Sequence, residues 1–259
     1  AASRPTRFRV GGEWFDVEGK FLYHLVQPIT NYRGLDLHWV PNGNSEKYAG
    51  VYGIPDSESE MVVRGTLRFS NYAPVVRAFQ DLQLLDETTS VEALKTGATG
   101  TAWANVIRER IGAAADADLE AALAEFLHGK LEQTRSELHA LPAYKALCAS
   151  NALDSTDAAP TPASLSQEIK TIVGAVKTLG LLNTEKLAPQ TASGLILDSL
   201  CSTMVAELAY QPHERDFVMM IHRITAYFPA TKETKTYVAT LSQRGETATA
   251  SATALTVGL

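Results

Sequence analysis

The alternation of apolar and polar residues from Val62 to Ser70 predicts a strand that carries a candidate site. Successive side chains of a strand point to opposite faces. One face carries apolar residues and a glycine: Met61, Val63, Gly65, Leu67 and Phe69. The other carries Arg64, Thr66 and Arg68. The apolar face suits a core, and the guanidiniums suit a carboxylate or phosphate, because arginine offers a planar fork of donors. Gly65 has no Cβ, so a ligand could approach the backbone there. The alternative is a half-exposed strand with a solvated polar face.

The residues around this strand predict further strands and short helices. Residues 8–17 alternate around Gly11-Gly12, which predicts a two-stranded hairpin. Residues 35–40 alternate as another strand. Ser45 is a candidate N-cap for a helix over 46–52. A second helix is predicted from residue 73 to residue 85.

The pattern becomes helical from residue 87 to about residue 209. Three apolar stripes recur at helical spacing: Leu119, Ala122, Leu123, Phe126 and Leu127; Ile169, Ile172, Val173, Val176 and Leu179; Leu197, Leu200, Cys201, Met204 and Leu208. Gly180 is predicted to end the second of these helices. Residues 154–162 are rich in Ser, Thr, Ala and Pro and predict an exposed loop.

Strand patterns return after the helices, at residues 216–223 and 237–242. We expect these two strands to pair antiparallel and to join the first sheet. The predicted fold class is therefore α+β. A mixed β-sheet substrate-binding domain, formed by 1–86 and 210–259, is interrupted by an all-α insert domain over 87–209.

Composition narrows the classes of function. Hydrophobic residues make up 45% of the 259 residues and charged residues 20%, which is typical of a soluble globular protein. The net charge of −6 argues against a nucleic-acid partner, and no apolar run predicts a membrane span. Cys148 and Cys201 lack metal-type spacing and are expected to be buried, in an intracellular, cytoplasmic or mitochondrial protein. The start at Ala1, without methionine, suggests a fragment.

Sequence motifs assign no catalytic residue. No glycine-rich dinucleotide motif, P-loop, G-x-S-x-G or H-E-x-x-H motif is present. The six histidines are scattered, so no metal site is expected. His222 is the best histidine for a catalytic role, although an ordinary histidine is the simpler interpretation. The loop over residues 42–45 offers a helix N-terminus to an anion, with Ser45 most simply the cap.

Three segments resemble the saccharopine dehydrogenase family, the NADP-dependent, glutamate-forming type also called saccharopine reductase. Residues 48–55 and 63–69 read Y-A-G-V-Y-G-I-P and V-R-G-T-L-R-F, similar to the family's Y-G-I and R-G-T-L-R-[YF]. Residues 214–220 read E-R-D-F-V-M-M, similar to E-[RK]-D-M-[VI]. Residues 251–259 read S-A-T-A-L-T-V-G-L, similar to S-A-M-A-K-T-V-G-L. The matches occur in the family's order, and the helical insert is the least similar part.

The resemblance implies the central and C-terminal part of a longer oxidoreductase. In the family an N-terminal Rossmann domain binds NADP(H), so no cofactor is expected in this chain, and the isolated chain is expected to be inactive. The family's reaction, in lysine biosynthesis, joins glutamate and aminoadipate semialdehyde as an imine that NADPH reduces to saccharopine; in lysine degradation it runs in reverse.

The resemblance also names candidate binding residues and partners. The family's Arg-Gly-Thr segment contacts saccharopine, which here implies Arg64, Gly65 and Thr66. Weaker candidates are Asn42, Ser45 and Arg68. The expected partners are a small amino-acid substrate, saccharopine or glutamate, and a second copy of the chain in a homodimer.

One loop departs from the family pattern. The family's P-N-R-D-S loop, whose arginine also contacts substrate, reads P-N-G-N-S over residues 41–45. Loss of that guanidinium removes a charge-assisted hydrogen bond worth about 1.5–3 kcal/mol. Two alternatives therefore stand beside the leading hypothesis. One is a relative that handles a different amino acid or imine. The other is a non-catalytic dimerisation or scaffold module whose working surface is the helical insert.

Overall fold

The computed structural model describes residues 4–29, 32, 34–150, 165–247 and 251–253. The chain divides into two compact units, Ala1–Met204 and Val205–Leu259, and each is described by itself. Small sheets and several helices confirm the predicted α+β class. The proposed division into a discontinuous substrate-binding domain and an insert over 87–209 stays a prediction.

The first unit begins with the hairpin that the sequence predicts. Strand β1 (Thr6–Val10) pairs antiparallel with β2 (Glu13–Val17). Between them Gly11 and Gly12 have φ angles of 62° and 81°, a left-handed conformation that glycine adopts without a steric penalty. A 3-10 helix, η1 (Gly19–His24), follows.

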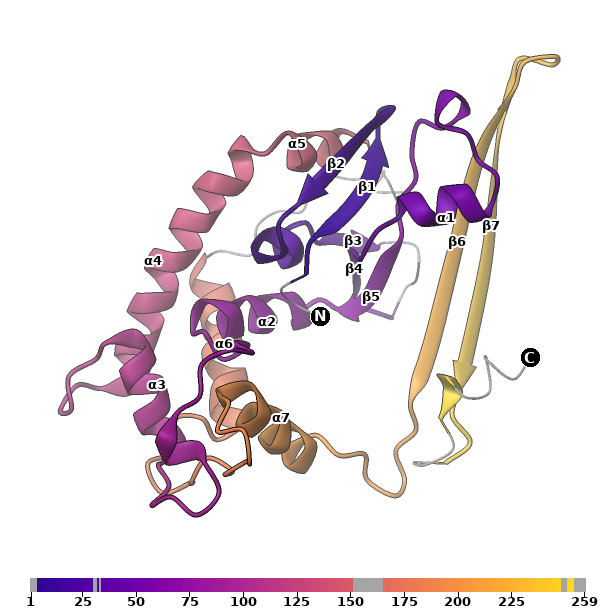
Figure 1. The fold of residues 1–259 in the computed structure, drawn as a ribbon. Coiled ribbons are helices and arrows are strands. Elements are labelled where there is room, and N and C mark those ends of the chain that lie inside the picture. The colour runs from indigo at the N-terminus through magenta and orange to yellow at the C-terminus, as the bar shows by residue number, and fades with distance from the viewer. Residues whose placement is uncertain (1–3, 30–31, 33, 151–164, 248–250, 254–259) are drawn as a thin grey trace. The chain divides into compact units, whose positions relative to one another are not determined.

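A three-stranded antiparallel sheet carries the candidate site (Figure 1). Its strand order is β3 (Gln27–Ile29), β4 (Leu37–Pro41) and β5 (Gly65–Phe69), so β5 is an edge strand. The short helices α1 (Glu46–Val51) and η2 (Asp56–Glu58) lie between β4 and β5 in the chain.

The apolar face of the β5 segment is not buried as predicted. Phe69 of β5 is 63% exposed, whereas Trp39 on neighbouring β4 is 3% exposed; Met61, 36% exposed, lies before the observed strand begins. The position of β5 at the sheet edge explains the difference, because an edge strand has a neighbour on one side only.

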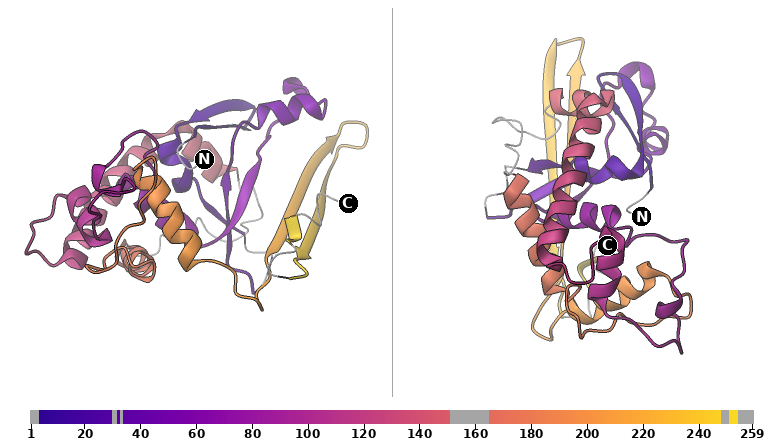
Figure 2. Two further views of the ribbon diagram at one scale, coloured as in Figure 1. Left: turned by 60° about the horizontal axis from the view of Figure 1, so that its bottom comes forward. Right: turned by 90° about the vertical axis from the view of Figure 1, so that its left-hand side faces the viewer.

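Helices make up the rest of the first unit. They are α2 (Tyr72–Asp81), η3 (Glu92–Leu94), α3 (Trp103–Ile111), α4 (Leu119–Ala140), α5 (Pro142–Ala149), α6 (Leu165–Thr178) and α7 (Ile196–Glu207). The views in Figure 1 and Figure 2 show α4 as the longest of these helices, and α4 packs against α6. The predicted α6 stripe is entirely buried, and Gly180 follows this helix with φ 73°, as expected for a C-terminal glycine. Asp118 caps α4 by accepting from the backbone N–H of Glu120 at 3.0 Å.

The third predicted stripe is correct only in part: Leu200 is buried and Met204 packs against the core, but other members of the stripe are exposed. Helix α7 buries Ile196, Ser199, Leu200 and Thr203, while Cys201 is exposed and Leu208 is 57% exposed. The buried indole of Trp103 explains which side of α7 faces inward, because its Nε1 donates to Thr203 Oγ1 at 3.0 Å. A buried donor needs an acceptor, so the threonine side of the helix turns inward.

The second unit contains a long antiparallel ribbon, drawn orange to yellow in Figure 2. Strands β6 (Phe217–Phe228) and β7 (Glu233–Arg244) pair along their whole length, as predicted. Among the described residues they form a two-stranded sheet of their own, so their predicted pairing with the first sheet is wrong. The predicted loop over 154–162 lies outside the described residues, as does most of 248–259.

Candidate functional site

The polar face of the β5 segment brings the predicted arginines together with residues of β4. Thr66 and Arg68 alternate along β5 and share a face, and Arg64 lies immediately before the strand. In the antiparallel register His38 lies directly opposite Arg68, and Val40 lies opposite Thr66. Directly opposed residues point to the same side of a sheet, so His38 belongs to the polar face as well.

Arg64 presents a guanidinium that no internal carboxylate neutralises among the described residues. It lies over the ring of Tyr48 from α1, with 5.0 Å between the guanidinium carbon and the ring centroid. Its backbone is fixed from both sides: its N–H donates to Ser45 Oγ at 3.0 Å, and its carbonyl accepts from Asn42 N–H at 2.9 Å. The side chain is exposed and stacked, a geometry that keeps its hydrogen-bond fork available to an anion.

Thr66 lies between the two arginines and is hydrogen-bonded to Asn42. The Asn42 side-chain Nδ2 donates to Thr66 Oγ1 at 2.8 Å. Because a hydroxyl also carries a proton of its own, Thr66 can accept this bond and still donate to a bound oxygen. Two of the predicted binding residues are therefore in contact with each other on the polar face.

Arg68 repeats the arrangement of Arg64 at the other end of the strand. Its guanidinium lies 5.2 Å from the ring centroid of Tyr72, at the start of α2. Its Nη1 donates to the carbonyl of Leu67 at 2.8 Å. No carboxylate in the described part of the chain forms an ion pair with it. Sequence reasoning missed the two tyrosine platforms, because nothing in the alternation shows that helices place aromatic rings beside this strand.

Gly65 is required for a reason other than the predicted ligand approach. A Cβ at this position would lie 2.6 Å from Cε3 of Trp39 and 2.9 Å from the carbonyl oxygen of Val40. Trp39 is almost fully buried, so its ring has little room to move. The glycine therefore lets the indole pack against the strand, on the face opposite the arginines.

Ser45 occupies the N-cap position of α1, as predicted, but its side chain makes no capping hydrogen bond. Ser45 is only 1% exposed, and its hydroxyl accepts a hydrogen bond from Arg64 N–H. The Asn44 side-chain oxygen instead accepts from Glu46 N–H at 2.8 Å. The capping hydrogen bond thus comes from Asn44, the residue before the N-cap. Helix α1 has six residues, and its first amide N–H already donates to the Asn44 side chain. The contribution of the loop over 42–45 is therefore to hold the backbone of Arg64 in place.

A buried ionic network joins η1, α2, α4 and α6 away from this face. Glu168 is 8% exposed and accepts from Arg77, and from Arg135 Nη2 at 2.9 Å. Arg77 Nη1 also lies 3.3 Å from Nδ1 of His24. Burial, with the charges of Arg77 and Arg135 added, lowers the pKa of His24 to about 2. The imidazole is therefore neutral and accepts from Arg77, which makes this a structural cluster.

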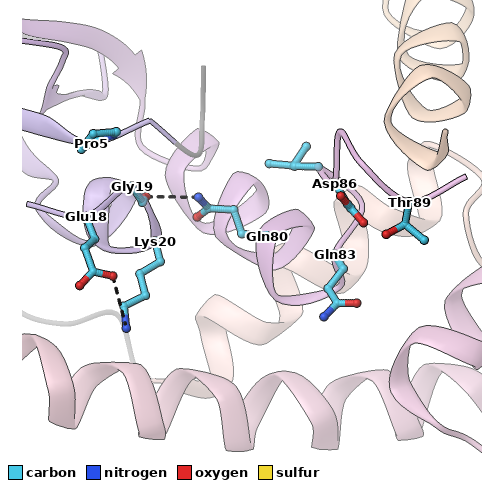
Figure 3. A pocket seen from close by; sticks show the side chains of 9 residues that line it. Pro5, Glu18, Gly19, Lys20, Gln80, Gln83, Asp86 and Thr89 are labelled. Atoms are coloured by element: carbon cyan, nitrogen blue, oxygen red, sulfur yellow. Dashed lines mark hydrogen bonds and ion pairs between the residues drawn. The ribbon is translucent and has the colours of Figure 1, made fainter.

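A hollow of about 730 Å³ lies elsewhere in the first unit, beside η1 and the end of α2 (Figure 3). Glu18 and Lys20 line one side of it, and Gln83, Asp86 and Thr89 line the other. Lys20 is already close to Glu18, at 3.8 Å, and hydrogen bonds led by Thr88 hold the pKa of Asp86 below its usual range. Its carboxylates make this hollow a poor match for an acidic substrate.

The described residues contain no Rossmann-type dinucleotide-binding unit. Their named strands pair antiparallel, whereas dinucleotide-binding folds use a parallel βαβ unit with a glycine-rich turn. Among these same residues no group of three or more His, Cys, Asp or Glu side chains is placed to hold a metal ion. No helix in the described ranges is long and apolar enough to cross a membrane. Cys148 and Cys201 are both exposed free thiols, so their predicted burial is wrong.

Comparison with known proteins agrees with the sequence motifs and the fold. A family model described as the saccharopine dehydrogenase C-terminal domain matches residues 1–259. The chain belongs to this family. Its relatives are named as saccharopine dehydrogenases and alpha-aminoadipic semialdehyde synthases, which makes the family one of oxidoreductases in lysine metabolism.

Individual relatives of the family are considerably longer than this chain. Mitochondrial alpha-aminoadipic semialdehyde synthase of Rattus norvegicus is 28% identical over 84% of the chain and 19% of that protein. The NADP(+), L-glutamate-forming saccharopine dehydrogenase of Schizosaccharomyces pombe is 26% identical over 86% of the chain and 41% of that protein. The apo, histidine-tagged, L-Glu-forming saccharopine dehydrogenase of Saccharomyces cerevisiae shares the fold, with a TM-score of 0.73 and 23% identity over 100% of this chain and 48% of that one. The chain thus spans less than half of each relative's length.

Proposed function

We propose that this chain supplies the substrate-binding wall of a saccharopine dehydrogenase-like oxidoreductase. The observation that carries the proposal is the exposed guanidinium of Arg64, which forms no ion pair within the described residues and lies over the ring of Tyr48. Asn42 and Ser45 hold the backbone of Arg64, and the hydroxyl of Thr66 lies two residues away. A carboxylate placed there would accept a charge-assisted bond from Arg64 and a neutral bond from Thr66. Saccharopine and glutamate both carry such carboxylates.

Redox chemistry in this proposal depends on a region beyond this chain. NADP(H) would be bound there, and would supply the hydride that reduces an imine of glutamate and aminoadipate semialdehyde, or accept it in reverse. The residues of this chain bind and orient the amino acid. The isolated chain is accordingly expected to bind substrate without turning it over.

Nuclear magnetic resonance titration of the isotopically labelled chain tests this proposal. Adding saccharopine should shift the amide signals of Arg64, Thr66 and their neighbours, while NADPH added alone should not. Arg64→Gln should weaken saccharopine binding about tenfold to a hundredfold, because it removes a charged hydrogen-bond donor.

The matched control is Arg108→Gln, because the guanidinium of Arg108 donates to the carbonyls of Ala114 and Ala117, away from β5. This variant should bind saccharopine like the unaltered chain. The proposal fails if saturating saccharopine leaves the β5 signals unmoved, or if the two glutamine variants bind it equally well.

The ribbon of the second unit favours self-association as an additional role. Ile224 and Tyr237 lie directly opposite each other on β6 and β7 and are 62% and 54% exposed. An isolated two-stranded ribbon is marginally stable in water, and exposed apolar residues mark contact surfaces. We propose that a second copy covers this face, because an antiparallel ribbon can present the same edge and face to its own two-fold mate.

Solution mass as a function of concentration tests the self-association proposal. Ile224→Glu should shift the mass toward the monomer, whereas Thr234→Glu, an exposed change on the opposite face of the ribbon, should leave it unchanged. A monomer at every concentration, or equal effects of the two variants, would contradict it.

A further inference from the structure

We infer that Arg9, a buried arginine of β1, is a positioning residue for Arg64. The inference rests on the proposed function and deepens it, because it names a group outside the binding face that determines where the Arg64 guanidinium lies. Arg9 is 8% exposed, so it acts through its neighbours in the fold and does not itself contact a ligand.

Strand β1 holds the two segments that flank the backbone of Arg64. Along its edge away from β2, it bonds to residues 43–45 and, two residues further on, to Val62. The second contact is a pair of backbone hydrogen bonds between Arg9 and Val62, at 3.0 and 3.1 Å. Arg64 is two residues beyond Val62, and its N–H donates to Ser45 Oγ. A shift of Val62 relative to β1 would therefore displace Arg64 as well.

The side chain of Arg9 holds the same segment at a second point. Its Nη1 lies 3.0 Å from Asp56 Oδ2, and its Nη2 donates to the Asp56 carbonyl at 2.8 Å. The same carboxylate oxygen accepts from Trp14 Nε1 of β2 at 3.0 Å, and the Arg9 guanidinium lies 5.6 Å from the centroid of the Trp14 ring. Asp56 is in η2, between α1 and Arg64 in the chain. One arginine thus fixes both Asp56 and Val62 on the way to Arg64.

The polar contacts of the Arg9 side chain lead away from its own hairpin. Among the described residues its ion pair and its side-chain hydrogen bond both go to Asp56. Arg7, two residues earlier on the same strand, pairs with Asp16 of β2, inside the hairpin, as well as with α1. Arg9 therefore connects the hairpin to the segment before Arg64. Because the Arg64 guanidinium forms no ion pair in the described chain, its location depends on how this backbone is held.

Titration of the labelled chain with saccharopine tests the inference with two matched variants. Asp56→Asn removes the charge that Arg9 holds on η2 and should weaken binding about threefold to tenfold, the range typical of an indirect effect on a site. Asp16→Asn removes a carboxylate that pairs with Arg7 inside the hairpin and should leave binding within about twofold. The two carboxylate side chains are 61% and 71% exposed, so neither change removes core packing.

Two further measurements separate positioning from stability. The amide signals of Val62 and Arg64 should shift in Asp56→Asn without ligand and should stay in place in Asp16→Asn. Because Asp56 acts through Arg64, Asp56→Asn should cost less than about twofold in a chain that already carries Arg64→Gln. Arg9→Lys makes the same test from the strand side. It keeps the charge but loses the planar fork, so it should recover part of the affinity that Arg9→Gln loses.

The outcomes distinguish this inference from the proposal beneath it. Equal effects of Asp56→Asn and Asp16→Asn on binding would refute it, as would an undiminished effect of Asp56→Asn in the Arg64→Gln chain. If Arg64→Gln weakens binding and Asp56→Asn does not, positioning by Arg9 is refuted while the proposed function stands. If Arg64→Gln itself leaves binding unchanged, the proposed function fails and the inference fails with it. Thermal unfolding of each variant confirms that the chain is folded during the titration.

Discussion

Replacement of Glu168 by glutamine should destabilise the first unit far more than an ordinary loss of a salt bridge. Its carboxylate is the common acceptor for Arg77 of α2 and Arg135 of α4, and it sits in the first turn of α6. Glutamine has nearly the same shape but no negative charge. The change therefore leaves the packing volume intact and removes the compensation for two guanidiniums.

The magnitude follows from how strongly each partner is buried. The Arg77 side chain is 11% exposed and cannot recover its hydration, whereas Arg135 is 32% exposed and can reach water. Breaking a buried ion pair from one side costs about 3–5 kcal/mol, because an uncompensated charge remains. We expect about 3 kcal/mol, since glutamine still offers one acceptor. For a unit of this size such a loss lowers the melting temperature by about 6–12 °C.

Urea unfolding with a matched variant provides the measurement. Glu120 of α4 pairs with Lys177 of α6 at 2.8 Å, so Glu120→Gln breaks an ion pair on the same two helices. Both partners are more than half exposed, and the expected cost is below about 1 kcal/mol. If Glu168→Gln costs no more than Glu120→Gln, burial does not set the energy of this network and the reasoning is refuted.

Three further predictions concern pH and packing, and the pH effects are read as differences between variant and unaltered chain. The pKa of His24 is lowered in the folded chain, so its contribution to the free energy of unfolding is complete above pH 6.5 and is lost as pH falls, by about 2–3 kcal/mol at pH 4.5. His24→Gln should remove this pH dependence of the free energy of unfolding, measured with urea. Burial raises the pKa of Asp81 to about 6, so ionising this carboxyl costs stability, and the free energy of unfolding falls as pH rises from about 4 to 6. Asp81→Asn should therefore stabilise the chain by about 1–3 kcal/mol at pH 7.5 and by little at pH 4. Gly65→Ala should cost about 1–3 kcal/mol through its clash with Trp39, whereas Gly50→Ala, in a helix with open space around the new methyl, should be neutral or slightly stabilising in the same thermal unfolding assay.

The sequence pattern correctly predicted the elements that are determined by residues close together in the chain. The hairpin at Gly11-Gly12 depends on two adjacent residues that tolerate positive φ, and both are visible in the sequence. The α6 stripe depends on helical spacing alone, and Ile172 and Val176 are fully buried, as that spacing predicts. In both cases the information lies within a few residues of the element that it determines.

Elements whose orientation depends on distant partners were not predictable in the same way. The buried face of α7 is set by the indole of Trp103, whose acceptor Thr203 is 100 residues away in the chain. The burial of Glu168 depends on Arg77, 91 residues away. A charged residue in an amphipathic helix is normally solvent-exposed, and the residues around Glu168 in the sequence give no sign of its burial.

The candidate site combines both kinds of information. Alternation correctly placed Thr66 and Arg68 on one face of β5, because period two is an intrinsic property of strands, whereas Arg64 lies just before the strand begins. The contact between Asn42 and Thr66 and the stacking of Arg64 on Tyr48 depend on how β4 and α1 return to the strand. The roles of the candidate residues in binding stay predictions until ligands are titrated.

Exposed apolar side chains next to the arginines indicate how the face would gain binding strength. Val51 and Tyr52, just after the Tyr48 platform, are 78% and 71% exposed, and Phe69 follows Arg68 at 63%. Large exposed apolar groups beside a cationic face are unfavourable in water unless another surface covers them. Covering them would also exclude water from Arg64, and a guanidinium–carboxylate attraction grows as the local dielectric constant falls. In the proposed function, the same closure would therefore bury these apolar side chains and strengthen the binding of an acidic substrate.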